Sequence, residues 1–220
     1  MERKTVWIPL VSLTEPTHES ERSVLLHLWI EPGGYGARPE ESWQRLHGCG
    51  LGVALAAAQT ALAAAGLPPP SRRLLHEPPV WQIANPDPRL SNAAGAALGI
   101  ALGTLLYEGR CPGERLIASG QFLSAPPARG AMLAPDPRLA AKLCAVRAFG
   151  PQDEPLPFLA PAHTADGVET AQACAELIAT LAALNIRVLP VASLEEAVAA
   201  CWRLDREVRS ASLLERAGSS

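Results

Sequence analysis

The stretch from Val80 to Tyr107 holds the residues best placed to do chemistry in this chain. An apolar run at 80–84 predicts a short β-strand. The two prolines that follow it predict a loop, because proline is excluded from helix interiors and keeps the residue before it out of helical geometry. Asn92 can then cap a small-residue helix over 93–107, since its side-chain oxygen accepts from free first-turn amides. Free amides and the positive end of the helix dipole meet at this point. We therefore expect the functional site at the start of this helix.

Other residue types that often do chemistry lack the spacing for it. The five cysteines form no CxxC pair, which argues against zinc and for reduced, mostly buried thiols, with Cys144 expected on the apolar side of its helix. The histidines have no ligand-like spacing either. The run Gly48–Gly52 superficially resembles a dinucleotide loop, but it follows a helical stretch instead of a strand. We expect no metal and no cofactor.

Composition and charge narrow the classes of partner. The chain has 220 residues, of which 48% are hydrophobic and 19% charged, as in ordinary globular domains. A formal net charge of -3 gives no reason to expect nucleic acid or an anionic membrane as partner. No signal-peptide-like segment opens the sequence, and its apolar runs are too short to span a membrane. Together with the unpaired cysteines, this predicts a cytoplasmic protein.

Periodicity and breakers predict the elements that must position the site. Strands are expected at 5–13, 23–30, 80–84, 116–123, 157–160 and 187–191, and helices at 41–46, 51–65, 93–107, 135–148, 165–183 and 193–204. Ser193 and Glu196 have the spacing of a capping box. The alternation predicts an α/β (α+β) fold, a mixed sheet with helices packed on one face. We expect a single domain over 1–204 and a frayed tail over 205–220.

In order and approximate spacing, these segments resemble the proteolytic domain of Lon-type ATP-dependent proteases. Asn92-Ala93-Ala94-Gly95 is similar to the family's Gly-Pro-Ser-Ala-Gly-like motif, IASGQF at 117–122 to its Thr-Gly-Glu strand segment, and LAAKLCAVRAFG at 139–150 to its lysine-bearing helix. The resemblance extends over most of the chain. It implies the Lon-type fold, which is also that of ribosomal protein S5 domain 2.

The same resemblance implies that the catalytic dyad is missing. The nucleophile falls on Ala93 and the lysine on Ala140, and a methyl group can replace neither. Lys142 follows two residues later, and because two residues rotate a helix by about 200°, we expect Lys142 to point away from the cleft. The sequence has no GxxxxGK[ST] motif, so we expect no ATPase module of the kind that usually accompanies such a domain.

Three hypotheses stay open. The favoured one is a Lon-like domain without peptidase activity that binds a protein partner or itself, with an ATPase acting in trans as one option. The second is a peptidase with a displaced Ser91/Lys142 dyad. The third is a ligand-binding or transferase cleft; kinase activity is disfavoured because the loop before Ala93 lacks phosphate-cradling glycines. The expected cleft residues are Asn92, Ala93, Ala94, Gly95, Ser119 and Gly120, and the candidate aromatic anchors for a partner are Trp29, Trp43, Trp81 and Trp202.

Overall fold

A six-stranded mixed sheet forms the centre of the protein. The computed structural model describes residues 3–11, 23–32, 46, 50–66, 79–84, 93–123 and 131–218. The strands are β1 (Lys4–Val11), β2 (Ser23–Pro32), β3 (Pro79–Ile83), β4 (Arg115–Ala118), β5 (Leu156–Pro161) and β6 (Ile186–Val191). Their order is β3-β2-β1-β4-β5-β6. β1 to β3 pair antiparallel, and β1, β4, β5 and β6 run parallel, which confirms the predicted mixed sheet.

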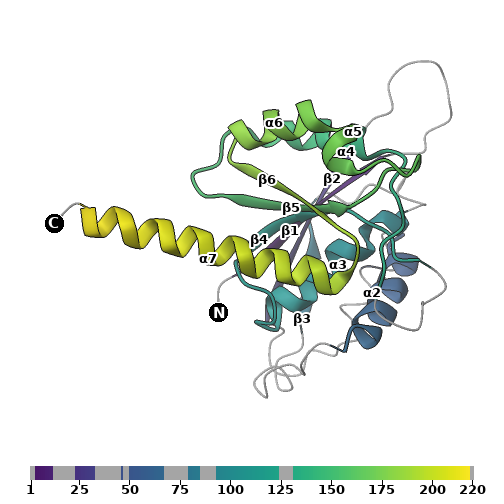
Figure 1. Cartoon of the computed structure of the whole chain (residues 1–220). Helices are drawn as coiled ribbons and strands as arrows, with labels where there is room; N and C mark the ends of the chain where they lie inside the picture. The colour runs from purple at the N-terminus through teal and green to yellow at the C-terminus, as the bar shows by residue number, and fades with distance from the viewer. Residues whose placement is uncertain are drawn as a thin grey trace.

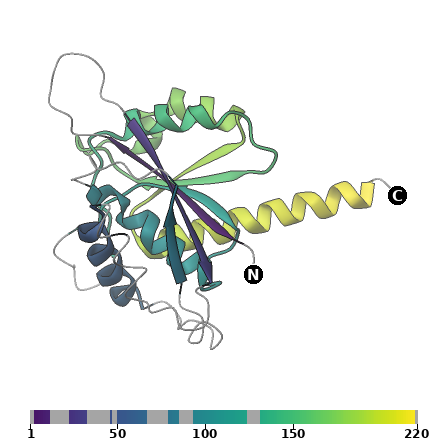
Figure 2. The same cartoon turned by 180° about the vertical axis from the view of Figure 1, so that it is seen from behind.

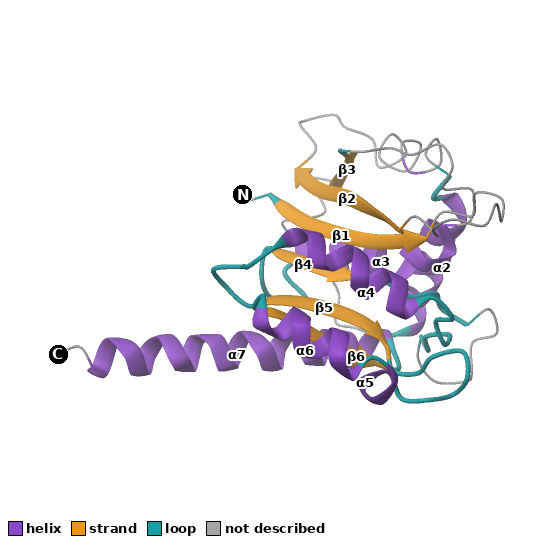
Figure 3. Cartoon of the chain, turned by 90° about the horizontal axis from the view of Figure 1, so that it is seen from above, coloured by secondary structure: helices purple, strands orange, loops and turns teal. Residues whose placement is uncertain are grey.

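Helices cover both faces of this sheet (Figures 1 and 3), so the expectation of helices on one face is wrong. One face packs against α2 (Gly52–Ala64), the 3-10 turn η2 (Ala93–Ala96), α3 (Ala97–Tyr107) and α7 (Leu194–Gly218). The other packs against α4 (Leu139–Val146), α5 (Thr170–Ala173) and α6 (Ala175–Ala183). Strand β5 explains the error. Leu159 joins the first core cluster and Phe158 the second, and a strand in a parallel sheet needs cover on both faces.

The small residues of α3 let the helix lie directly on the sheet. A Cβ at Gly99 would stand 2.6 Å from Ile8 Cδ1, and one at Gly103 would stand 2.5 Å from Trp81 Cη2. These separations are far below van der Waals contact, so only glycine allows this approach. Nearly every side of α3 is buried inside the domain, which explains why the helix is apolar all round. Within the described ranges, no helix combines the length and apolar character needed to cross a membrane.

Two helices differ from their predicted extent. The single helix expected at 165–183 is divided into α5 and α6 at Cys174, whose φ and ψ of -119° and 23° are not helical. The helix expected at 193–204 continues as α7 through most of the segment expected to be a frayed tail, and Figures 1 and 2 show it projecting from the body. Ser193 is confirmed as its N-cap, because the Glu196 N–H donates to Ser193 Oγ at 3.2 Å. The other half of the predicted capping box differs: Glu196 Oε2 accepts from the Ala192 N–H at 2.7 Å, one residue before Ser193.

Candidate functional site

Lys142 lies at the centre of the candidate site and points inward. Its exposure is only 7%, which is unusual for a lysine. The chain has two lysines, Lys4 and Lys142. The buried residues of α4 are Leu139, Lys142, Leu143 and Val146. Their i, i+3, i+4, i+7 spacing defines one helix face. The expectation that Lys142 points away is wrong, and Ala140 is the exposed residue. The two-residue step does separate them, but the lysine shares the face of the leucines.

The Lys142 ammonium is held by two side chains. Its Nζ donates to Asp136 Oδ2 at 2.6 Å and to Ser119 Oγ at 2.9 Å. Ser119 Oγ donates in turn to the Pro9 carbonyl oxygen at 3.2 Å, and Asp136 Oδ1 accepts from the Arg138 N–H at 3.0 Å. A buried charge needs both a counter-charge and hydrogen bonds to offset its lost hydration. This network supplies both.

The backbone fixes the positions of Ser119 and Asp136. Ser119 follows β4 directly, and its N–H donates to the Leu159 carbonyl of β5 at 3.0 Å. The Asp136 N–H donates to the His163 carbonyl at 3.2 Å, beyond the end of β5. The network therefore forms where the parallel strands end, the side of α/β sheets at which ligands usually bind.

The start of the small-residue helix forms the facing wall. Gly120 N–H donates to the Gly95 carbonyl at 2.9 Å, and the Leu98 N–H donates to the Gly120 carbonyl at 3.0 Å. These bonds tie η2 and α3 to the end of β4. A Cβ at Gly95 would stand 3.2 Å from Lys142 Nζ and 3.9 Å from Ser119 Oγ. Glycine here lets the backbone lie directly against the amine.

The structure thus brings three of the expected cleft residues together: Gly95, Ser119 and Gly120. Ala94 is half-buried in η2, and Ala93 begins η2, although its side chain lies outside the described part. Asn92 and the fallback nucleophile Ser91 also lie outside the described residues, so their roles stay predictions. The sequence reasoning missed Asp136. Its signal was an acidic residue just before a helix that carries a lysine on its apolar face.

Two adjoining cavities open onto this network. The larger, of ≈ 270 Å³, is lined by Leu10, Val11, Gly95, Asp136, Pro137, Arg138 and Lys142. The smaller, of ≈ 100 Å³, is lined by Gly95, Gln121, Ala134, Pro135, Asp136, Pro137 and Lys142. We call the two together the Lys142 cleft. None of these described lining residues carries a hydroxyl or a thiol.

The geometry suits binding better than nucleophilic attack. Ser119 is the hydroxyl in contact with Lys142, but it is fully buried and does not line either cavity. An ammonium paired with a carboxylate has no free electron pair with which to take a proton from a nucleophile. It can donate a hydrogen bond to a ligand oxygen, and the apolar walls can cover the ligand's uncharged part.

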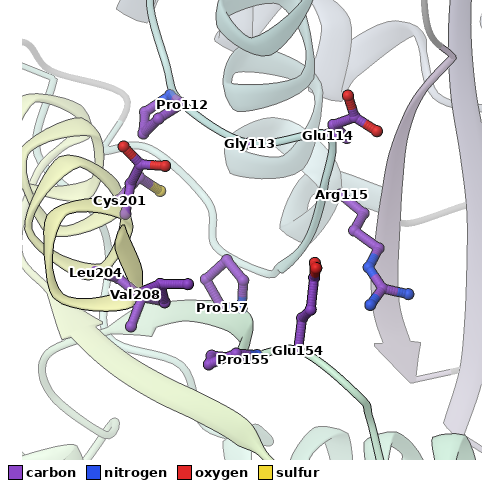
Figure 4. Close-up of a pocket in the computed structure, with 11 residues that line it drawn as sticks. Pro112, Gly113, Glu114, Arg115, Glu154, Pro155, Pro157, Cys201, Leu204 and Val208 are labelled. Atoms are coloured by element: carbon purple, nitrogen blue, oxygen red, sulfur yellow. The ribbon is translucent and has the colours of Figure 1, made fainter. Parts of the chain in front are cut away.

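A third cavity lies at the opposite edge of the sheet, where β4 and β5 begin (Figure 4). It measures ≈ 420 Å³ and is lined by Pro112, Gly113, Glu114, Arg115, Glu154, Pro155, Pro157, Cys201, Leu204, Asp205 and Val208. Figure 4 shows residues of α7 on one side and Glu114, Arg115 and Glu154 on the other. We call it the α7 cavity.

The remaining sequence candidates lie away from the Lys142 cleft or outside the described part. Cys144 is exposed, so its predicted core packing is wrong, because it follows the buried pair Lys142 and Leu143 around α4. Trp81 is buried at 2% exposure, and Trp202 of α7 is 42% exposed. Trp29 is half-buried beneath the Arg3 guanidinium, which lies 3.9 Å from the ring centroid. Trp43 lies outside the described residues.

Comparison with known proteins adds no family to this geometry. No protein-family model matches the sequence, and no curated protein is significantly similar to it. The resemblance to Lon-type proteolytic domains therefore stays a prediction.

Proposed function

We propose that this chain is a Lon-protease-like domain that binds polypeptide in the Lys142 cleft and does not hydrolyse it. The observation that carries the proposal is the pairing of Lys142 with Asp136 at 2.6 Å in a cleft whose described lining has no hydroxyl and no thiol. A lysine engaged in this way serves as a fixed hydrogen-bond donor. The alanine at the expected nucleophile position, Ala93, also supports the absence of hydrolysis.

The chemistry of the cleft favours a peptide-like ligand. Lys142 and Arg138 supply donors for carbonyl or carboxylate oxygens, while Leu10, Val11 and Pro137 supply apolar walls. Polypeptide has both kinds of group in alternation. The larger cavity's volume of ≈ 270 Å³ lies just below the range of ligand pockets, which begins at about 300 Å³, so the cleft suits a short part of an extended segment.

The test uses fluorescein-labelled casein as an unfolded polypeptide. We expect fluorescence anisotropy to show binding, with no release of labelled peptides over hours. Arg138→Glu places a negative charge in the cleft wall and should weaken binding by about tenfold, the equivalent of roughly 1.4 kcal/mol. Arg115→Glu, the matched change in the α7 cavity, should leave binding unchanged. Binding that is undetectable, or equally sensitive to both changes, would contradict the proposal.

One observation favours a second candidate, a peptidase that uses Ser91. Lys142 Nζ faces Gly95 at the start of the small-residue helix, and this hypothesis requires a lysine at that place. This activity would require Lys142 to lose its proton in the complex. Casein hydrolysis that disappears in both Ser91→Ala and Lys142→Met would establish this candidate in place of the first.

A further inference from the structure

Two cysteines from distant parts of the sequence meet in the core beside the α7 cavity. Cys111 follows α3 and is 2% exposed, while Cys201 lies in α7 and is 4% exposed. The Cys111 N–H donates to the Leu105 carbonyl at 3.1 Å, so the end of α3 fixes its position. Both belong to the same cluster of buried residues.

The Cys111 and Cys201 side chains are neighbours in this cluster. Interaction with the Cys201 side chain is the main reason that the pKa of Cys111 lies well above its ordinary value, followed by burial and by the charge of Cys201. Cys111 therefore keeps its proton. A disulfide requires the two sulfur atoms to come within roughly 2 Å of each other, and neighbouring cysteine side chains in one cluster can reach this separation by side-chain rotation.

The cavity makes one of these sulfurs reachable. Cys201 lines the ≈ 420 Å³ α7 cavity, and Pro112, the residue after Cys111, lines it as well. Figure 4 shows the Cys201 side chain between the helix and Pro112. A small oxidant that enters the cavity can therefore reach Cys201, whereas Cys111 does not line the cavity.

We propose that Cys111 and Cys201 form an intramolecular disulfide when the protein meets a hydroperoxide. Cys201 sulfur attacks the peroxide oxygen, the O–O bond breaks, and a sulfenic acid forms with release of water or an alcohol. Cys111 sulfur then attacks Cys201 sulfur, the S–O bond breaks and a second water leaves with the Cys111 proton. Two thiols are oxidised to one disulfide and one peroxide is reduced. The new bond joins α7 covalently to the end of α3.

The experiment treats the full chain with hydrogen peroxide, blocks free thiols with iodoacetamide and maps tryptic peptides by mass spectrometry. We expect a Cys111–Cys201 cross-linked peptide that dithiothreitol removes. A disulfide that closes a loop of about 90 residues should raise Tm by roughly 10 °C. Cys201→Ala should abolish both the cross-link and the rise in Tm.

A matched variant tests whether the pairing is specific. Cys144 and Cys174 also lie near each other: burial first, and then the charge of Cys144, raise the pKa of Cys174. A Cys144→Ser/Cys174→Ser variant should form the Cys111–Cys201 bond as the unaltered chain does. Free, fully alkylated Cys111 and Cys201 after peroxide treatment, in the unaltered chain or in this variant, would overturn the proposal. Because the unaltered chain is tested with and without oxidant, a variant that fails to fold cannot obscure the result.

Discussion

The Lys142 cleft and the α7 cavity lie at opposite edges of the same sheet and place their charges differently. In the smaller Lys142 cleft, the charged pair Lys142–Asp136 has side chains that are each only 9% exposed. At the larger α7 cavity, Glu114 is 52% exposed and lies 3.9 Å from Lys4. Volume alone would direct attention to the α7 cavity. Buried, hydrogen-bonded charge identifies the Lys142 cleft instead, because such charge is costly and is seldom kept without a role.

The largest expected effect comes from removing the carboxylate of the buried pair. Asp136→Ala leaves the Lys142 ammonium buried beside Ser119 alone, and should lower the free energy of unfolding by about 3 kcal/mol. Glu114→Ala removes an exposed carboxylate at the α7 cavity and should change it by less than about 0.5 kcal/mol. Urea denaturation of both variants measures the difference directly.

A double variant separates charge from packing. Adding Lys142→Met to Asp136→Ala removes the unpaired ammonium and should restore part of the lost stability. Equal losses in the free energy of unfolding for Asp136→Ala and Glu114→Ala would show that the buried carboxylate stabilises the fold no more than the exposed one.

The next effect concerns the glycines that line up along η2 and α3. Gly103→Ala drives a methyl group against Trp81 and should cost about 1–3 kcal/mol, measured by urea denaturation. Gly95→Ala places a methyl group 3.2 Å from Lys142 Nζ, a less severe contact than that at Gly103, so the loss of stability should be smaller. The second change should instead weaken casein binding at the cleft. A Gly95→Ala variant with intact binding would show that this wall does not shape the cleft.

The smallest expected effect is the pH dependence of stability that comes from His27, a residue outside both cavities. Burial first, and then the nearby Arg3 charge, lower the pKa of His27, which stacks on Trp7 with ring centroids 5.2 Å apart. Because the folded-state pKa lies below the unfolded value, the contribution to stability is complete above about pH 6.5 and is lost as the pH falls through the folded-state pKa.

Thermal unfolding between pH 7 and pH 5 measures this contribution. The Tm of the unaltered chain should fall more than that of His27→Gln over this range. Solvent screening at this half-exposed residue keeps the difference small. If Tm falls equally with pH in the two proteins, His27 makes no measurable contribution to the pH dependence of stability.

The sequence predicted the elements better than it predicted which side chains meet. Alternation and breakers located five of the strands within two residues at each end, since every strand has at least one buried face, but β4 ends at Ala118, five residues before its predicted end. The cover on the second face was missed because β5, whose alternate residues serve two cores, reads as one apolar run. Cysteine contact between positions 111 and 201 has no local signal at all. The long α7 was shortened because polar residues suggested a tail, although most of them favour helix.

The Lys142 error has a definite cause. The family alignment assigned the inward position to Ala140, whereas the Leu139, Leu143 and Val146 pattern by itself places position 142 on the buried face. Periodicity within this chain was the better guide. Asp136 could then have been sought as the counter-charge that a buried lysine requires.

The most direct test of the account is 15N NMR of protein labelled at lysine, because Lys4 and Lys142 are the only lysines in the chain. Hydrogen bonds to Asp136 and Ser119 should slow proton exchange at the Lys142 amine and give an observable NH₃⁺ signal. Lys142→Met should remove this signal, and Asp136→Asn should shift it. Rapid exchange at both lysines, with no change in Asp136→Asn, would contradict a lysine held by this network at the base of the cleft.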